Sequence, residues 1–179
     1  ILGDAQVVLA GGQESMSMSM HAAYLRAGQK MGDMQMVDTM IRDGLWDAFN
    51  NYHMGTTAEN VAQKWQISRD QQDEFALASQ NKAEAAQKEG RFDDEIAPLP
   101  SRMAVQDKTT GEISHKDVTL TKDEGNRPDT TLEGLQSLKP VMGEGTSITA
   151  GNASQLSDGA SAAVLMSDDE ASRRGLEPL

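Results

Sequence analysis

Two short apolar runs near opposite ends of the chain constrain its fold most strongly. Residues 5–10 read Ala-Gln-Val-Val-Leu-Ala and residues 162–166 read Ala-Ala-Val-Leu-Met. Runs of this length, nearly free of polar residues, are typical of strands buried on both faces in the middle of an α/β sheet. The first run is followed by Gly11-Gly12, which we expect to end its strand. The pattern therefore predicts an α/β fold.

The segments between these runs carry turn and strand signals. Residues 13–20 alternate Met with Ser, which predicts a half-buried extended segment rather than a methionine metal site, because thioethers alone are poor ligands for most ions. Residues 24–49 are rich in Gly, Asp and Met and predict a protruding excursion with short strands. Residues 103–120 predict a hairpin with an exposed turn at Lys108–Gly111.

Capping signals predict two central helices. Thr56-Thr57-Ala58-Glu59 and Ser68-Arg69-Asp70-Gln71 each place a hydroxyl three residues before Glu or Gln, the pattern of a capping box. We expect the first helix to run to about Trp65 and the second to stop at Gly90.

Two further helices are predicted in the last third of the chain. Thr130 or Thr131 would cap a short helix that Pro140 stops. Ser167 would open a final helix that ends at Gly175.

Composition narrows the classes of function. With 16 Lys and Arg against 28 Asp and Glu, the net charge is −12, which argues against nucleic acid or an anionic membrane as the main partner. The chain has no Cys, which excludes disulfides, thiolate zinc sites and a Cys nucleophile within it. A mean hydropathy of −0.55 leaves no expected membrane span.

The first residues lack the signs of a natural start. Ile1 is not an initiator Met, and neither a basic segment nor a long apolar run follows it. We therefore expect no signal peptide here and further polypeptide before Ile1. The lack of a transit segment favours a cytoplasmic location.

Several common catalytic patterns are missing from the sequence. The three His, at positions 21, 53 and 115, are far apart and form no metal-binding pair. No Gly-x-Ser-x-Gly elbow is present, and the glycine-rich stretches lack the Lys of a phosphate-binding loop. Metal, serine-hydrolase and P-loop chemistry are therefore disfavoured.

The best ligand-binding candidate from the residues alone is the segment 150–154. Its small side chains would let a slender ligand approach the backbone, and Asn152 and Ser154 would offer hydrogen bonds. Tight packing without a ligand explains the same pattern. Arg127, before Pro128, is a cation suited to a phosphate or an adenine face, and a surface charge is the alternative.

Five blocks of sequence, taken in order, resemble the thiolase family, in particular its acetyl-CoA acetyltransferase type. Their likeness runs the length of the chain, which makes the match more specific than a single motif. The blocks are residues 10–17, 52–62, 79–83, 149–154 and 158–160.

This resemblance implies the thiolase fold, a layered αβαβα α/β enzyme whose N-terminal half is interrupted by a loop domain. On this reading, residues 1–20 end the sheet of the N-terminal domain, residues 21–149 form the loop domain, and residues 150–179 return to the N-terminal domain. The stretch Ala22 to Ile41 matches the family's tetramerisation loop. The resemblance therefore implies a homotetramer, and neither a nucleic acid nor a membrane as partner.

The resemblance also implies which residues contact the substrate, coenzyme A or acetyl-CoA; no cofactor would be permanently bound. Arg127 would take the cationic, adenine-facing role, and five of the other positions would line the tunnel for pantetheine: His53, Met54, Ala150, Gly151 and Ser154. Gly134 has no side chain where some relatives place a Ser. The complete set of matching positions is Leu45, His53, Met54, Gln80, Arg127, Met142, Ala150, Gly151 and Ser154.

The family's activity is acyl transfer through an acyl-Cys intermediate, either condensing two acetyl-CoA to acetoacetyl-CoA and CoA or running the reverse thiolysis. Its nucleophilic Cys lies upstream of the matched segment, and its Asn, His and second Cys lie downstream. We therefore expect these 179 residues alone to be inactive. The alternatives are a 3-ketoacyl-CoA thiolase of broader specificity and a non-catalytic CoA-binding or assembly fragment.

Overall fold

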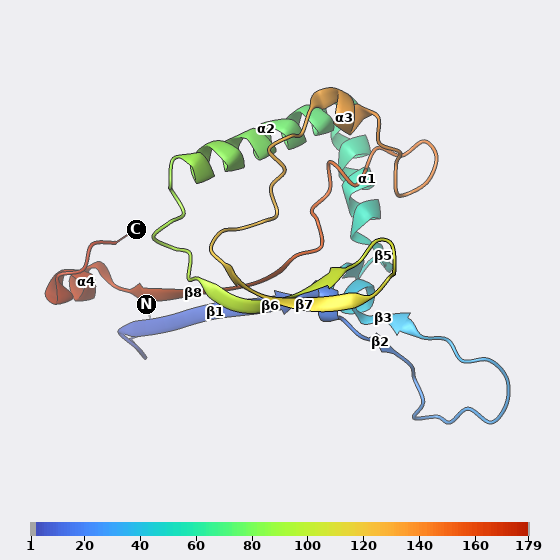
Figure 1. The fold of residues 1–179 in the computed structure, drawn as a ribbon, viewed down its shortest axis with the longest axis horizontal. Helices are drawn as coiled ribbons and strands as arrows, with labels where there is room; N and C mark the ends of the chain where they lie inside the picture. Colours follow the sequence, from blue (N-terminus) through green and yellow to red (C-terminus); the bar gives the residue numbers. More distant parts are fainter. Residues whose placement is uncertain (1–2, 179) are drawn as a thin grey trace. The chain divides into compact units, whose positions relative to one another are not determined.

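The computed structural model describes residues 3–178 and contains a mixed α/β fold, as predicted (Figure 1). Its contacts divide the chain into two compact units. The first, which we call the terminal unit, contains residues up to His53 together with the chain from Leu156 onward. The second, which we call the central unit, is Met54–Gln155.

The terminal unit is built on two antiparallel strands from opposite ends of the chain. β1 (Val7–Ser15) pairs with β8 (Asp158–Met166) over nine residue pairs, with Val7 opposite Met166. Gly11 lies where the two backbones approach closely, since a Cβ at this position would be 2.7 Å from the Ser161 carbonyl oxygen. This close approach explains why β1 continues through Gly11-Gly12, where the sequence predicted its end.

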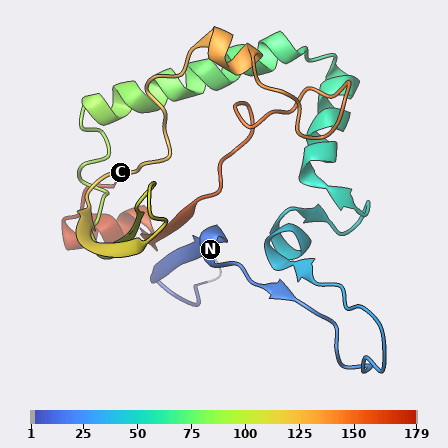
Figure 2. The same ribbon diagram turned by 45° about the vertical axis from the view of Figure 1, so that its right-hand side comes forward.

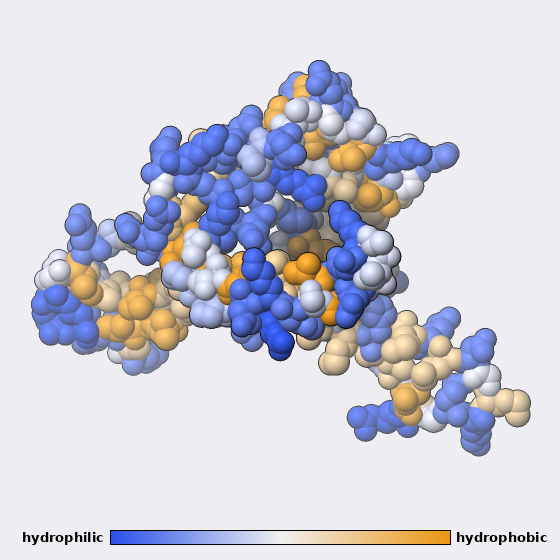
Figure 3. Space-filling model, in the orientation of Figure 1, coloured by the Kyte–Doolittle hydropathy of each residue, from blue (hydrophilic) through white to orange (hydrophobic). Residues whose placement is uncertain are grey.

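The prediction that both strands are buried is wrong for the described chain. Leu9 in β1 is 74% exposed and Val164 in β8 is 60% exposed, and apolar side chains of this pair appear as an orange area at the lower left of Figure 3. The physical reason is that β1 and β8 form a two-stranded sheet among the described residues. An apolar run predicts that a strand is buried, but it does not identify the segments that pack against it.

Short elements make up the rest of the terminal unit. The segment 13–20 was predicted to be extended and half-buried. Its first three residues are extended in β1, and a 3₁₀ turn follows, in which the Ser17 N–H and hydroxyl both donate to the Asp158 carboxylate. Short strands occur in the excursion as predicted, with an additional π-helix. The elements are η1 (Met16–Met18), β2 (His21–Ala22), β3 (Val37–Asp38), η2 (Met40–Gly44), β4 (Trp46–Asp47) and β5 (Tyr52–His53).

The final helix confirms both of its sequence signals. α4 (Asp168–Arg174) begins after Ser167, whose hydroxyl accepts a hydrogen bond from the Glu170 N–H at 3.2 Å. It ends at Gly175, which adopts φ +66°, the left-handed conformation that glycine reaches without a steric penalty.

Three helices form the framework of the central unit: α1 (Met54–Trp65), α2 (Arg69–Lys88) and α3 (Leu132–Gln136). Figure 2 shows the short α3 lying along α2. The capping box at Ser68 and the cap at Thr131 are confirmed, and α2 ends just before Gly90 as predicted.

The capping box predicted at Thr56 is wrong. α1 already begins at Met54, so Thr56 lies inside the helix. The Glu59 carboxylate, which the box would have turned back toward the start of the helix, instead accepts hydrogen bonds from Ser147 and Ile148.

The predicted hairpin is also confirmed. β6 (Leu99–Gln106) pairs antiparallel with β7 (Ile113–Leu120). The Asp107 carboxylate accepts from the N–H groups of Thr109 and Thr110 and so holds the exposed turn. Among residues 3–178, no helix is both long and apolar enough to span a bilayer.

Glu170 gives the terminal unit a measurable dependence of stability on pH. Hydrogen bonds from Arg173 and Arg174 lower its pKa from 4.5 to about 2. Because the folded pKa lies below the ordinary value, this contribution to stability is complete above about pH 4.5 and is lost as the pH falls toward 2.

We expect Glu170→Gln to lower the urea midpoint at pH 7 and the difference from wild type to narrow toward pH 2. Glu177→Gln, an exposed carboxylate outside this cluster, is the control; an equal difference at both pH values would contradict the assignment.

Candidate ligand-binding site

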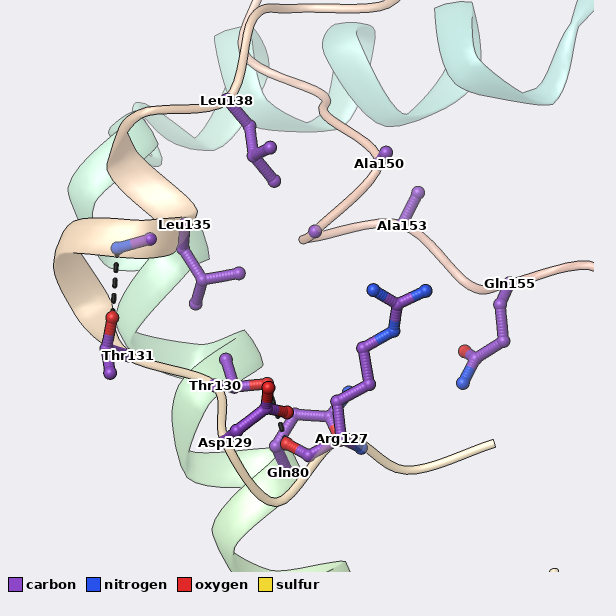
Figure 4. Close-up of a pocket in the computed structure, with 12 residues that line it drawn as sticks. Gln80, Arg127, Asp129, Thr130, Thr131, Leu135, Leu138, Ala150, Ala153 and Gln155 are labelled. Carbon is purple, nitrogen blue, oxygen red and sulfur yellow. Dashed lines mark hydrogen bonds between the residues drawn. The ribbon is translucent and has the colours of Figure 1, made fainter. Parts of the chain in front are cut away.

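A cavity of about 290 Å³ lies within the central unit, between α3 with its preceding loop and the segment 150–155 (Figure 4). Gln80 of α2 contributes to its floor. The remaining lining residues are Arg127, Asp129, Thr130, Thr131, Gly134, Leu135, Leu138, Ala150, Gly151, Ala153 and Gln155.

Arg127 supplies the cation of this cavity, and its backbone is held on both sides. Its N–H donates to the Gln80 Oε1 at 2.7 Å, and its carbonyl oxygen accepts from the Thr130 hydroxyl at 2.7 Å. Figure 4 shows its side chain extending toward the segment that contains Ala153 and Gln155. Within the described residues its guanidinium forms no ion pair. The positive charge is therefore available to an anionic or planar ligand group.

The opposite side of the cavity is apolar and narrow. Leu135 and Leu138 face the backbone of Ala150 and Gly151. A Cβ on Gly151 would lie 2.6 Å from the nearest side-chain carbon of both leucines, a distance at which neighbouring atoms must shift. The absence of a side chain at Gly151 therefore lets Leu135 and Leu138 pack directly against its backbone, and together they form a narrow apolar side of the cavity.

The backbone that forms the Gly151 wall is fixed by buried hydrogen bonds. Thr149 is fully buried, and its hydroxyl accepts from the N–H groups of Gly151 at 3.2 Å and Asn152 at 3.3 Å. The Asn152 side chain accepts from the Thr149 N–H at 2.8 Å and donates to Asp73 and to the Ser147 carbonyl. The hypothesis that Asn152 offers hydrogen bonds to a ligand is therefore wrong, because the protein itself uses both ends of the amide.

A second carboxylate anchors the same loop on α1. Glu59 accepts from the N–H groups of Ser147 at 2.8 Å and Ile148 at 2.7 Å, and from the Ser147 hydroxyl at 3.0 Å. Burial by itself would raise the pKa of Glu59, but these hydrogen bonds outweigh it and lower the pKa. Glu59 is thus held as an anion that orders the loop.

The structure brings together four of the nine site residues that the sequence predicted. Gln80, Arg127, Ala150 and Gly151 line one cavity. Ser154 follows on the same segment, is exposed and is outside the lining set.

The other four predicted residues lie elsewhere. In the central unit, Met142 packs its sulfur against Gly55, and Met54 begins α1 and is 47% exposed. Leu45 caps η2 and His53 lies in β5, both in the terminal unit. Their contacts with a substrate stay predictions.

Sequence reasoning missed much of the lining. Thr131 was identified only as a helix cap, a role it does fulfil, since its hydroxyl accepts from the Gly134 N–H at 3.1 Å. That capping signal placed α3 correctly but did not show that the helix borders a cavity. The lining residues outside every predicted ligand-binding position or segment are Asp129, Thr130, Thr131, Leu135, Leu138 and Gln155.

The groups that line the cavity are suited to binding a ligand. The cavity combines the Arg127 cation, the Asp129 carboxylate, hydroxyl and amide groups, and an apolar wall beside small residues. Over residues 3–178, no three His, Asp or Glu side chains gather in a way that could hold a metal ion. These features suit a long ligand with an anionic, planar end and a thin apolar body.

Comparison with known proteins places this chain in a family. The thiolase N-terminal domain matches residues 1–169. The acetyl-CoA acetyltransferase of Paracoccus denitrificans is 58% identical over 180 residues, which cover 100% of this chain and 43% of that protein.

Two solved structures share the fold. The crystal structure of the Bacillus anthracis acetyl-CoA acetyltransferase matches with a TM-score of 0.82 and 41% identity, over 99% of this chain and 43% of that one. The human mitochondrial 3-ketoacyl-CoA thiolase in complex with CoA matches with a TM-score of 0.80 and 40% identity, over 98% of this chain and 41% of that one. The chain thus spans less than half the length of these relatives. It belongs to the thiolase family, whose N-terminal domain it matches over residues 1–169.

Proposed function

We propose that this chain is the coenzyme A-binding part of an acetyl-CoA C-acetyltransferase. The observation that carries the proposal is the cavity in which Arg127, without an ion-pair partner in the described chain, stands at one side and the apolar wall of Leu135, Leu138 and Gly151 stands at the other. CoA has the matching parts, with phosphates and adenine at one end and a slender pantetheine arm at the other. The human relative with CoA bound supports this choice of ligand.

The same proposal assigns the remaining position-matched residues and the domains. Leu45, His53, Met54, Met142 and Ser154 would contact CoA together with the four residues that line the cavity. Residues 1–20 and 150–179 would belong to the N-terminal domain, and residues 21–149 to the loop domain. A protein of this activity would serve fatty acid metabolism, and we propose a cytoplasmic location.

The proposed reaction joins two acetyl groups. The acetyl group of the first acetyl-CoA passes to the Cys sulfur, and CoA leaves as its thiol. A base then removes an α-proton from a second acetyl-CoA, and the carbanion forms a carbon–carbon bond to the acyl carbon. The Cys–acyl thioester breaks, the Cys thiolate leaves and takes up that proton, and acetoacetyl-CoA and the free Cys thiol result. The chain contains no Cys, so this nucleophile would stand on polypeptide outside these 179 residues. Cleavage of acetoacetyl-CoA by a pure sample of the 179 residues would contradict that assignment.

A 3-ketoacyl-CoA thiolase of broader chain-length specificity is the second candidate, and the fold match to a 3-ketoacyl-CoA thiolase favours it. Assays of the whole protein with four-carbon and longer 3-ketoacyl thioesters separate the two. A non-catalytic CoA-binding fragment is the third reading, and thiolysis by the whole protein would exclude it.

Removing the cation should weaken CoA binding. We expect Arg127→Gln to raise the dissociation constant for CoA about tenfold, because a charge-assisted hydrogen bond to a phosphate or a stacking contact is lost. Isothermal titration calorimetry of the whole protein measures this change. Arg102→Gln, an exposed arginine of β6 outside the cavity, is the control. Equal affinities of wild type and Arg127→Gln would contradict the proposed role of Arg127.

Adding a side chain at Gly151 should also weaken CoA binding. We expect Gly151→Ala to raise the dissociation constant for CoA and to lower the free energy of unfolding by about 1–3 kcal/mol, since its methyl group would overlap Leu135 and Leu138. Calorimetry and urea denaturation measure the two effects. Gly44→Ala adds a methyl group that meets nothing within 4 Å and should change neither. CoA binding unaffected by Gly151→Ala would show that the ligand takes another route.

We also propose a homotetramer that forms through the stretch from Ala22 to Ile41. This stretch carries exposed apolar side chains, including Met31 at 91% and Tyr24 at 78% exposure, which favours a partner surface. We expect the whole protein to have the mass of a tetramer in multi-angle light scattering, and Met31→Ser with Tyr24→Ser to reduce it. A stable monomer in the wild type would contradict the proposal.

A further inference from the structure

A single buried carboxylate lies behind the candidate cavity. Asp73, in the first half of α2, is fully buried. One of its oxygens accepts from the Arg69 Nε at 2.7 Å, and the other accepts from the Asn152 Nδ2 at 3.1 Å. Each oxygen therefore holds a different segment of the chain.

The first connection leads to α3. Besides contacting Asp73, the Arg69 guanidinium donates through Nη2 to the carbonyl oxygens of Leu135 at 2.7 Å and Leu138 at 3.2 Å. The side chains of these two leucines form the apolar wall of the cavity. The position of that wall is thus tied to Asp73 through Arg69.

The second connection leads to the opposite wall. Asn152 accepts from the Thr149 N–H at 2.8 Å, and the Thr149 hydroxyl accepts from the Gly151 N–H at 3.2 Å. The Gly151 backbone is therefore tied to the same carboxylate through Asn152.

We propose that Asp73 is a positioning residue that sets the separation of the two cavity walls, and through it the affinity for the pantetheine and nucleotide parts of the thioester. This inference rests on the proposed function, since it concerns the same cavity. Asp73 itself is absent from the lining of the cavity.

The charge of Asp73, and not only its shape, is needed for this role. A carboxylate accepts at both oxygens, whereas an asparagine amide accepts at one end and donates at the other. In Asp73→Asn the new NH₂ group would face either Arg69 or Asn152, both of which are donors there. One of the two walls would lose its connection while the volume of the side chain stays the same.

The test compares Asp73→Asn with wild type in the whole protein. We expect the KM for acetoacetyl-CoA and the dissociation constant for CoA to rise about tenfold, the effect of losing a hydrogen bond to a buried charge, with kcat changed less than about twofold. The KM for the N-acetylcysteamine thioester of acetoacetate, which lacks the nucleotide and most of the pantetheine arm, should stay unchanged. A general loss of structure would affect both substrates alike.

Glu84→Gln is the matched control. Glu84 also pairs with a cation four residues away on α2, Lys88 at 2.6 Å, but Lys88 is exposed and neither residue lines the cavity. It should leave both KM values unchanged.

The outcomes separate the inference from the proposed function. If wild type fails to bind CoA, the proposed function fails. If wild type binds CoA and folded Asp73→Asn binds it equally well, or loses both substrates alike, only the inference is overturned.

A measurement on the wild type decides the matter if Asp73→Asn does not fold. Because both walls are tied to one group, CoA should slow hydrogen exchange together at the Leu138 amide, which bonds within the α3 turn, and at the Gly151 and Asn152 amides. Protection confined to one of the two walls would overturn the inference.

Discussion

The central unit depends on how it accommodates the charge of Asp73. A carboxylate with no exposed surface is tolerated only when donors satisfy it, and here Arg69 and Asn152 do so. Removing one partner of such a buried pair costs roughly 3–5 kcal/mol. Since the partners belong to α2 and to the loop before residue 153, and Arg69 continues to the carbonyls of α3, one arrangement of three segments satisfies the charge. The cavity is the space left between those segments.

Arg127 lines this space and Arg69 lies behind one of its walls, and their different surroundings give the two arginines different roles. Arg69 spends its donors on Asp73 and on two carbonyl groups, so it belongs to the framework. Arg127 is held only by its backbone, through Gln80 and Thr130, and its guanidinium has no ion-pair partner in the described chain. Arg127 is therefore the arginine suited to bind a ligand, because a cation with no internal partner is available to an anion.

The terminal unit illustrates what an apolar sequence pattern can predict. The runs at 5–10 and 162–166 correctly indicated strands, and the structure pairs them with each other along nine residues. Their faces are exposed among the described residues, although the pattern is that of buried strands. An apolar run indicates that burying the strand's faces is favourable, whereas other segments of polypeptide determine what packs against them. The likeness to thiolases more than twice as long as this chain agrees with that reading.

The sequence by itself determined the features whose partners lie within a few residues. The cap at Ser68, the cap at Thr131, the end at Gly175 and the turn before β7 all follow from hydrogen bonds or backbone conformations local to each site. The types of residue at 150–154 and at Arg127 also indicated ligand binding without any structure, and the family resemblance added Gln80 to the lining residues predicted. Only the tertiary structure decided that Glu59 serves a loop 88 residues away instead of its own helix end, and that Asn152 serves Asp73, 79 residues away, instead of a ligand. Over such separations, residue spacing carries no information about contact, because the path of the intervening chain decides which polar groups meet once water is excluded.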